Sequence, residues 1–181
     1  MSSLEVVRSV PEDAEEIGRI RAANWEEQYA NLDDETAKWM RAEIERISGP
    51  EGTSSRAYWI ERALQPGAQN YWLSGRAAGS SAIIGFLEAR KYEEGMHKDG
   101  TQELRSLHLL PGQRGCGVGQ AFIDKAHQWL DPSREIFLYV VEANKAAQRF
   151  YRRSPNNYEL TGRSNMHGPF VVSQMARPPQ S

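Results

Sequence analysis

A glycine-rich turn between an expected strand and an expected helix constrains this sequence more than any other feature. The apolar run Leu104–Leu110 is closed by Pro111-Gly112, and the segment Gln113–Gly119 follows it with three glycines. Apolar residues then recur at helical spacing over Phe122–Leu130. Glycines let the backbone take positive φ angles and approach a ligand closely, and the start of a helix offers unpaired N–H groups to an anion. The sequence therefore predicts a strand, a turn suited to phosphate groups and a helix in direct succession.

The turn does not match two well-known nucleotide loops. A Walker A loop needs Gly-Lys-Ser/Thr, whereas Gly119 is followed by Gln120 and Ala121. A dinucleotide fingerprint needs the spacing G-x-G-x-x-G, whereas this turn reads G-x-G-x-G. Taken alone, the glycines leave two interpretations open, an anion site and a plain strand-to-helix turn.

Strands and helices alternate along the rest of the chain. The expected strands are Leu4–Val10, Tyr71–Leu73, Ile83–Ala89, Leu104–Leu110, Ile136–Val141, Tyr158–Gly162 and Phe170–Met175. The expected helices run from the acidic turn after Pro11 to Gln28, then over Asp34–Ile47, Arg56–Leu64, Phe122–Leu130 and Asn144–Arg153, with a break at Ser48–Ser55 and turns at Ser74–Gly79 and Tyr92–Gly100. The continuous apolar run Ile136–Val141 is typical of a central strand covered on both faces. This order predicts an α/β-type sheet with at least one parallel pair.

Composition and charge limit the classes to which the chain can belong. Its 181 residues suffice for one domain with its own core, so we expect a single domain over residues 1–181. A formal net charge of -2 and a pI of about 6.1 argue against a nucleic-acid partner. No apolar run approaches the ~18–20 residues of a membrane helix, and the first residues lack a signal-peptide core. Cys116 is the only cysteine and the four histidines show no metal-ligand spacing. We therefore expect no disulfide, no metal, no membrane association and a cytoplasmic location.

Two motifs in sequence order resemble one protein family. Arg114-x-x-Gly117-x-Gly119, after a strand that ends in proline, resembles the pyrophosphate loop of the GNAT superfamily, the acyl-CoA-dependent N-acyltransferases. Downstream, Val141–Tyr151 is similar to the next strand and helix of that superfamily, with its Asn-x-x-Ala-x-x-Phe-Tyr motif. The resemblance covers residues 103–160. It implies an α/β (α+β) fold with a mixed, mostly antiparallel sheet of about six or seven strands, splayed in the middle and flanked by helices.

The segment after the second motif departs from the family pattern. Family members often continue with Leu-Gly-Phe, whereas here Arg152-Arg153 leads into Ser154–Tyr158. Asparagine tolerates the left-handed conformation that the family glycine supplies, and Tyr158 can take the place of the phenylalanine. We expect the fold to survive this change in the loop.

The resemblance implies acetyl-CoA or another acyl-CoA as the donor. Backbone N–H groups of the glycine-rich turn would hold its pyrophosphate, supported by the side chains of Gln113 and Arg114. The free edge of Leu107–Leu109 would pair with the pantetheine arm, and the amide of Leu109 could bind the thioester carbonyl. Asn144 would contact the pantetheine or cap the final helix. The full set expected to contact the cofactor is Leu107, Leu109, Gln113, Arg114, Gly115, Cys116, Gly117, Val118, Gly119, Asn144 and Ala147.

Tyr151 is the expected catalytic acid. It matches the family tyrosine near the sulfur atom, where a hydroxyl can protonate or hydrogen-bond the leaving thiolate. A tyrosine at helical spacing can also be a plain core residue. Cys116, in contrast, has no histidine partner nearby in sequence, and we expect it to be a bystander.

The base that deprotonates the amine has three candidates in the sequence. Glu103 starts the motif strand at a position that holds a catalytic glutamate in some members, although it can equally be a solvated strand-end residue. His108 has a suitable ordinary pKa, but its side chain alternates away from Leu107 and Leu109, which favours a packed or exposed role. Glu88 is the third candidate.

The acceptor is the least constrained part of the prediction. Trp25 and Tyr29 lie four residues apart on one helical face, where they would line the acceptor site or simply fill the core. The function expected from the resemblance is transfer of acetyl from acetyl-CoA to a primary amine by direct attack in a ternary complex, with a small-molecule acceptor favoured. Two alternatives stay open, a protein or peptide N-acetyltransferase and a non-catalytic acyl-CoA-binding module. A homodimer is expected by analogy alone.

Overall fold

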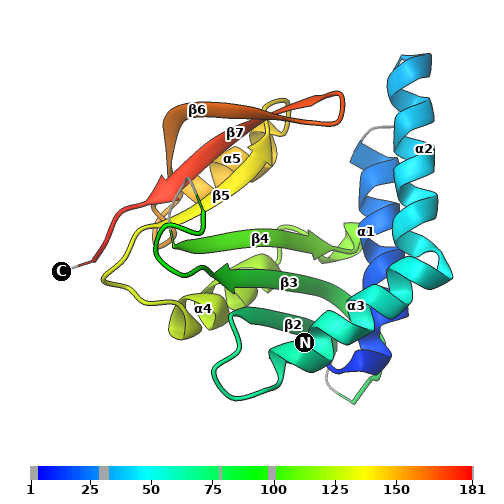
Figure 1. Cartoon of the computed structure of the whole chain (residues 1–181), viewed down its shortest axis with the longest axis horizontal. Helices are drawn as coiled ribbons and strands as arrows, with labels where there is room; N and C mark the ends of the chain where they lie inside the picture. Colours follow the sequence, from blue (N-terminus) through cyan, green and yellow to red (C-terminus); the bar gives the residue numbers. More distant parts are fainter. Residues whose placement is uncertain (1–3, 29–32, 78, 98–100, 181) are drawn as a thin grey trace. The chain divides into compact units, whose positions relative to one another are not determined.

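The computed structural model describes residues 4–28, 33–77, 79–97 and 101–180 and divides the chain into two compact units. Unit 1 comprises residues 1–88 and 106–125, and unit 2 comprises residues 89–105 and 126–181. Figure 1 labels the elements, which in chain order are β1 (Leu4–Arg8), η1 (Pro11–Asp13), α1 (Ala14–Gln28), α2 (Asp34–Ser48), α3 (Pro50–Ala63), β2 (Asn70–Ala77), β3 (Ile83–Lys91), β4 (Gln102–Leu109), η2 (Pro111–Gln113), α4 (Val118–Trp129), β5 (Ile136–Val141), α5 (Lys145–Arg152), β6 (Glu159–His167) and β7 (Phe170–Arg177). Three elements, β3, β4 and α4, contribute residues to both units, and the expectation of a single domain stays a prediction.

The strands form a mixed sheet, which confirms the predicted fold class. Within the described residues the seven strands lie in the order β1-β2-β3-β4-β5-β7-β6. The pairs β1–β2, β5–β7 and β6–β7 are antiparallel, and β4–β5 is parallel. The register of β4 with β5 covers only Glu103 and Leu104 in the described chain. Both residues belong to unit 2, and the expected opening in the middle of the sheet stays a prediction.

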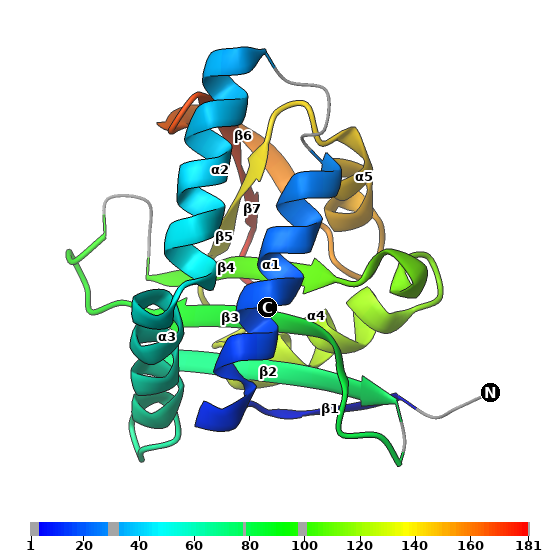
Figure 2. The same ribbon diagram turned by 90° about the vertical axis from the view of Figure 1, so that its right-hand side faces the viewer.

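The core of unit 1 lies between the N-terminal helices and one face of its strands. Helices α1 and α3 lie over this face in Figure 2, and α2 packs against these two helices. Alternate residues of a strand point to opposite faces, so Trp72 and Gly75 of β2 face opposite sides. Trp72 is buried with Ile17, Ile20 and other apolar residues of the helices and strands. Gly75 instead meets the ring of Phe122 from α4.

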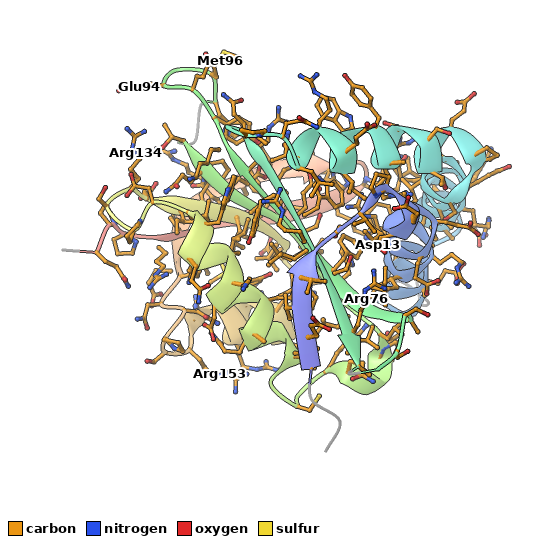
Figure 3. All side chains as sticks on the ribbon, turned by 90° about the horizontal axis from the view of Figure 1, so that it is seen from below. Asp13, Arg76, Glu94, Met96, Arg134 and Arg153 are labelled. Carbon is orange, nitrogen blue, oxygen red and sulfur yellow. The ribbon has the colours of Figure 1, made fainter. Side chains whose placement is uncertain are left out.

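A buried polar network ties β1 and β2 to the start of the first helix. The Asp13 carboxylate accepts hydrogen bonds from the Ser74 hydroxyl at 2.8 Å and from the Arg76 guanidinium, and Ser74 also bonds Ser9 at 2.8 Å. Asp13 and Arg76 point toward one another in Figure 3. Because every member has a partner, these polar groups are stably buried in the sheet.

The prediction of a turn over Ser74–Gly79 is wrong for its first half. Strand β2 runs to Ala77 and pairs with β1 in register, Val7 opposite Ser74 and Val6 opposite Gly75. Serine and glycine are typical of turns, but here Ser74 is satisfied by the polar network and Gly75 gives room to an aromatic ring.

The break expected over Ser48–Ser55 is also wrong, because α3 begins at Pro50. Gly49 ends α2 and takes the N-cap position of α3. Proline is well suited to the first position of a helix, since its missing N–H would have no intrahelical partner there. One residue therefore separates two helices where the sequence suggests a longer interruption.

Unit 2 contains the apolar strand β5 between β4 and β7, with helix α5. Phe137 and Leu138 of β5 are fully buried together with Tyr158. The loop before β6 behaves as predicted, because Asn157 has a φ of 56° in the left-handed region and Tyr158 fills the core. Among the described helices of both units, none is long and apolar enough to cross a membrane.

Gly75 gives a direct test of the packing between β2 and α4. A Cβ at this position would lie 2.7 Å from the Phe122 ring, so we expect Gly75→Ala to destabilise the protein by about 1–3 kcal/mol. Gly112 has no atom within 4 Å of a built Cβ and no positive φ, so Gly112→Ala is the matched control and should change stability by less than about 0.5 kcal/mol. Urea unfolding measures both variants, and equal stabilities would contradict this packing.

Candidate functional site

The glycine-rich turn has the backbone geometry that the sequence predicts. Gly115 and Gly117 have φ angles of 78° and 89°, which only glycine adopts without strain. A Cβ built on either residue meets no atom within 4 Å, so the turn opens into free space. Helix α4 begins directly after it at Val118.

The first turn of α4 also has backbone N–H groups without an intrahelical partner. The first hydrogen bond of α4 runs from the Ala121 N–H to the Gly117 carbonyl at 3.1 Å. The N–H groups of Val118 and Gly119, in the first turn of the helix, therefore have no intrahelical partner. A helix N-terminus preceded by a glycine turn attracts an anion through these groups and through the helix dipole.

The neighbouring loop side chains differ in exposure. Gln113 is the last residue of the short helix η2 and is partly buried. Val118, the first residue of α4, is buried. The thiol of Cys116 is exposed and lies 3.3 Å from the carbonyl oxygen of Gln113. An exposed thiol in the middle of the turn is a chemical reporter of what binds there.

The end of β4 supplies a second set of backbone groups. Strands β3 and β4 run antiparallel, as the arrows in Figure 1 show. The Leu110 N–H donates to a β3 carbonyl at 2.9 Å, and the His108 carbonyl faces Gly85 of β3. Backbone groups of successive residues alternate between neighbours in such a strand, so Leu107 and Leu109 face the other edge of β4. This is the edge that the sequence assigns to the pantetheine arm.

The side chain of Arg114 is engaged by helix α1. Its Nη2 donates to Asn24 Oδ1 at 2.8 Å and to Glu27 Oε2 at 2.8 Å. Sequence reasoning gave this guanidinium a supporting contact to phosphate, and that role stays a prediction. Asn24 was not predicted as a site residue. Its polar side chain on the apolar face of α1, near Ile17 and Ile20, was the feature of the sequence that could have indicated it.

Glu103 is a buried carboxylate in unit 2 and not a solvated strand end. It is 9% exposed, accepts a hydrogen bond from the Tyr92 hydroxyl, and lies 3.6 Å from Nε of Arg105. Burial and the bond to Glu103 raise the pKa of Tyr92, so that phenol stays protonated as a donor. Its role as a base is an open prediction.

Glu88 is a second buried carboxylate, in unit 1. One of its oxygens lies 3.7 Å from the Arg21 guanidinium of α1, which also lies 3.4 Å from the Ser106 hydroxyl. Arg21 thus lies between the carboxylate of Glu88 on β3 and the hydroxyl of Ser106 on β4.

His108 is packed, as the strand alternation predicts. Its ring stacks on Phe86 with centroids 5.1 Å apart. Desolvation by burial, with the charges of Arg21 and Arg114, lowers the pKa of His108 from an ordinary value of 6.5 to about 3. A ring with this pKa is neutral at physiological pH and is a weak base.

Asn144 and Tyr151 lie at the two ends of α5 in unit 2. Asn144 caps the helix, because its Oδ1 accepts a hydrogen bond from the Ala147 N–H at 3.0 Å, and this confirms one of its two expected roles. The Tyr151 ring makes edge contacts with Phe150 and Tyr158. Burial raises the pKa of Tyr151, so the hydroxyl keeps its proton at neutral pH.

The two residues expected to line the acceptor site are only partly described. Trp25 lies on α1 and is partly buried, and Tyr29 lies outside the described residues. In the described part of the chain, no group of three or more His, Cys, Asp or Glu side chains is placed to hold a metal ion.

Comparisons with known proteins identify a family and a shared fold. The sequence profile of the acetyltransferase (GNAT) family matches residues 23–154. No curated protein matches the chain in sequence. The structure is similar to PaiA N-acetyltransferase from Thermoplasma acidophilum in complex with coenzyme A, with 21% identity, a TM-score of 0.72, and coverage of 95% of this chain and 98% of that one.

Two further solved structures share the fold. YncA from Salmonella typhimurium, solved with acetyl-CoA, is 13% identical with a TM-score of 0.67 over 99% of this chain and 96% of its own. A GNAT-family acetyltransferase from Streptococcus pneumoniae is 14% identical with a TM-score of 0.67 over 98% of this chain and 100% of its own. At these identities the similarity shows the fold.

The low pKa of His108 predicts how stability depends on pH. Between pH 6.5 and about 3 the unfolded chain binds a proton at His108 that the folded chain does not bind, so lowering the pH through this window favours unfolding. In His108→Gln this contribution is absent, and the loss of unfolding free energy with falling pH should be shallower than in the wild type. Urea unfolding at several pH values between 4 and about 7 compares the slopes. Equal slopes, or a His108 ring that titrates near 6.5 by NMR, would contradict the structure.

Proposed function

The chain belongs to the acetyltransferase (GNAT) family, and on that premise we propose that it transfers an acetyl group from acetyl-CoA to a primary amine by direct attack in a ternary complex. The observation that supports the proposal most directly is the glycine-rich turn. Gly115 and Gly117 have positive φ angles there, directly before the first turn of α4. The relatives from T. acidophilum and S. typhimurium were solved with coenzyme A and with acetyl-CoA, which supports acetyl-CoA as the donor.

The turn fits a pyrophosphate in shape and in charge. The space over Gly115 and Gly117, which a Cβ would enter, leaves room for phosphate oxygens to approach the backbone. The N–H groups of residues 115–119 would donate to these oxygens, and the positive end of α4 would favour their charge.

The edge of β4 fits the thioester end of the same donor. N–H and C=O groups of Leu107 would pair with an amide of the pantetheine arm as in a β-ladder. The N–H of Leu109 would donate to the thioester oxygen, where negative charge develops as the amine attacks.

Acetyl-CoA supplies a thioester whose carbonyl carbon bonds to the amine nitrogen while the carbon–sulfur bond breaks. The Tyr151 hydroxyl, kept protonated by burial, would donate its proton to the departing thiolate. A carboxylate would take the proton that the ammonium group must lose, and we assign this role to Glu103, with Glu88 as the alternative. We do not assign this role to His108, because burial lowers its pKa and makes the ring a weak base.

We propose a small-molecule amine as the acceptor. Trp25 and Tyr29 are the residues assigned to the wall of its site. Exposed acids at this end of α1 support the proposal, since Glu26 and Glu27 beside Trp25 attract a cationic amine.

Binding to the turn is tested with a glycine variant and a matched control. Gly117→Glu places bulk and negative charge where the pyrophosphate would lie, and we expect it to abolish acetyl-CoA binding in calorimetric titration. Gly67→Glu introduces the same side chain at a φ of 74° with nothing within 4 Å of its Cβ, so it should carry a similar cost in stability and bind acetyl-CoA as the wild type does. Normal binding by Gly117→Glu would refute the assignment of the turn. ATP and NAD serve as ligand controls and should not bind.

The role of Tyr151 is tested by removing only its hydroxyl. Tyr151→Phe keeps the ring contacts with Phe150 and Tyr158, so we expect an unchanged Kd for acetyl-CoA and a turnover about 100-fold lower with any amine that the wild type acetylates. Free thiol release measures the rate. Unchanged turnover would remove Tyr151 from the chemistry, and binding without turnover in the wild type would point to a non-catalytic module.

A further inference from the structure

Asn24 of α1 has a buried amide side chain that forms hydrogen bonds with both parts of the proposed donor site in unit 1, the end of β4 and the glycine-rich turn. It is 7% exposed. Its Nδ2 donates to the carbonyls of Ile20 and Leu109, each at 2.9 Å, and its Oδ1 accepts from Arg114 at 2.8 Å. One contact is thus local to α1, one reaches the end of β4, and one reaches the glycine-rich turn.

The contact to β4 fixes a single peptide group. The carbonyl of Leu109 and the N–H of Leu110 belong to the same peptide plane. Asn24 holds the carbonyl, and the Ile84 carbonyl of β3 accepts from the N–H at 2.9 Å. With both polar atoms held, this plane cannot rotate without breaking a hydrogen bond, and the backbone of Leu109 is held with it.

The same contact also changes what the edge of β4 presents to a ligand. A carbonyl without a partner beside a thioester oxygen would repel the negative charge that develops there. Because Asn24 donates to the Leu109 carbonyl, that acceptor is already satisfied. The N–H of Leu109 is then the group that this residue offers to a ligand.

The contact to Arg114 holds the turn to the helix. Arg114 also pairs with Glu27, but both of these side chains are about half exposed, at 45% and 47%, and exposed ion pairs contribute little. The bond to the buried Asn24 is the one that can fix the guanidinium. Held in this way, Arg114 tethers the turn to α1 at the residue that precedes Gly115.

We infer that Asn24 is a positioning residue, which through separate hydrogen bonds orients the thioester-binding end of β4 and the pyrophosphate-binding turn toward one donor molecule. The inference rests on the proposed function, because it assigns the way in which the acetyl-CoA site is held in shape. It also gives Arg114 the role of a tether that acts through Asn24.

Three variants separate the two contacts. Arg114→Gln removes the bond to the turn and leaves the bond to Leu109. Asn24→Asp keeps an oxygen acceptor for Arg114 but places a second oxygen against the carbonyls of Ile20 and Leu109, where Nδ2 now donates. Asn24→Ala removes both bonds.

Calorimetric titration measures the Kd of each variant for acetyl-CoA and for coenzyme A. The two Kd values distinguish the contact of Asn24 with Arg114 from its contact with Leu109. We expect Arg114→Gln to weaken both ligands by the same factor, about five- to tenfold, because both carry the pyrophosphate that the turn holds. Asn24→Asp should weaken acetyl-CoA about fivefold more than coenzyme A, because only acetyl-CoA has a thioester carbonyl to place. Asn24→Ala should show both effects.

A control variant separates positioning from stability. Ser74→Ala removes a buried hydrogen bond to Asp13 in the same unit and should lower the thermal unfolding midpoint without changing either Kd. If the Asn24 and Arg114 variants behave in the same way, Asn24 is a structural residue only and the inference is overturned. Should Asn24→Ala fail to fold, the half-exposed Arg114→Gln and the near-isosteric Asn24→Asp still decide the question. A wild type that binds neither ligand would show instead that the proposed function is wrong.

Discussion

The geometry of the proposed donor site depends on the hydrogen bonds that hold the last residues of β4. Leu107 and Leu109 face the edge of β4 opposite β3, and they lie outside the register with β5, which covers Glu103 and Leu104. An open strand edge needs other support to keep its shape. Helix α1 gives that support through Asn24, and β3 gives it through Ile84, so the strand reaches the glycine-rich turn in a fixed orientation.

Buried charges beneath α1 set the electrostatics of the same unit. The guanidinium of Arg56 donates to the carbonyls of Ala14 in α1 and Ile47 near the end of α2, and Gly18 leaves it room. Desolvation, with the nearby charge of Arg21, lowers the pKa of Arg56 to about 10, which leaves it charged at neutral pH. A cation at the end of α2 also interacts favourably with the helix dipole. Burial, together with the charges of Arg21 and Arg114, keeps the His108 imidazole neutral, and the base is therefore sought among the carboxylates.

The parts of the structure that local sequence determines were predictable. The positive φ angles of the glycine turn, the apolar strand β5, the capping role of Asn144 and the left-handed Asn157 each follow from the chemistry of one short segment. The extension of β2 through Ser74 was not predictable, because its polar side chain is satisfied by Asp13 and Ser9 from other elements. The hydrogen bonds of Asn24 could not be predicted for the same reason. Its partners Leu109 and Arg114 lie 85 and 90 positions away in the chain.

The thiol of Cys116 can report whether the glycine-rich turn binds acetyl-CoA through its pyrophosphate. Cys116 is exposed, is the only cysteine in the sequence, and lies in the middle of the turn. The measurement is the rate of its alkylation by iodoacetamide as acetyl-CoA is titrated, with a short acetyl thioester that lacks the nucleotide as the control. If the turn binds the pyrophosphate, acetyl-CoA should slow the alkylation of Cys116 increasingly until binding is saturated, and the short thioester should not slow it. Alkylation at an unchanged rate when acetyl-CoA is saturating would contradict this binding.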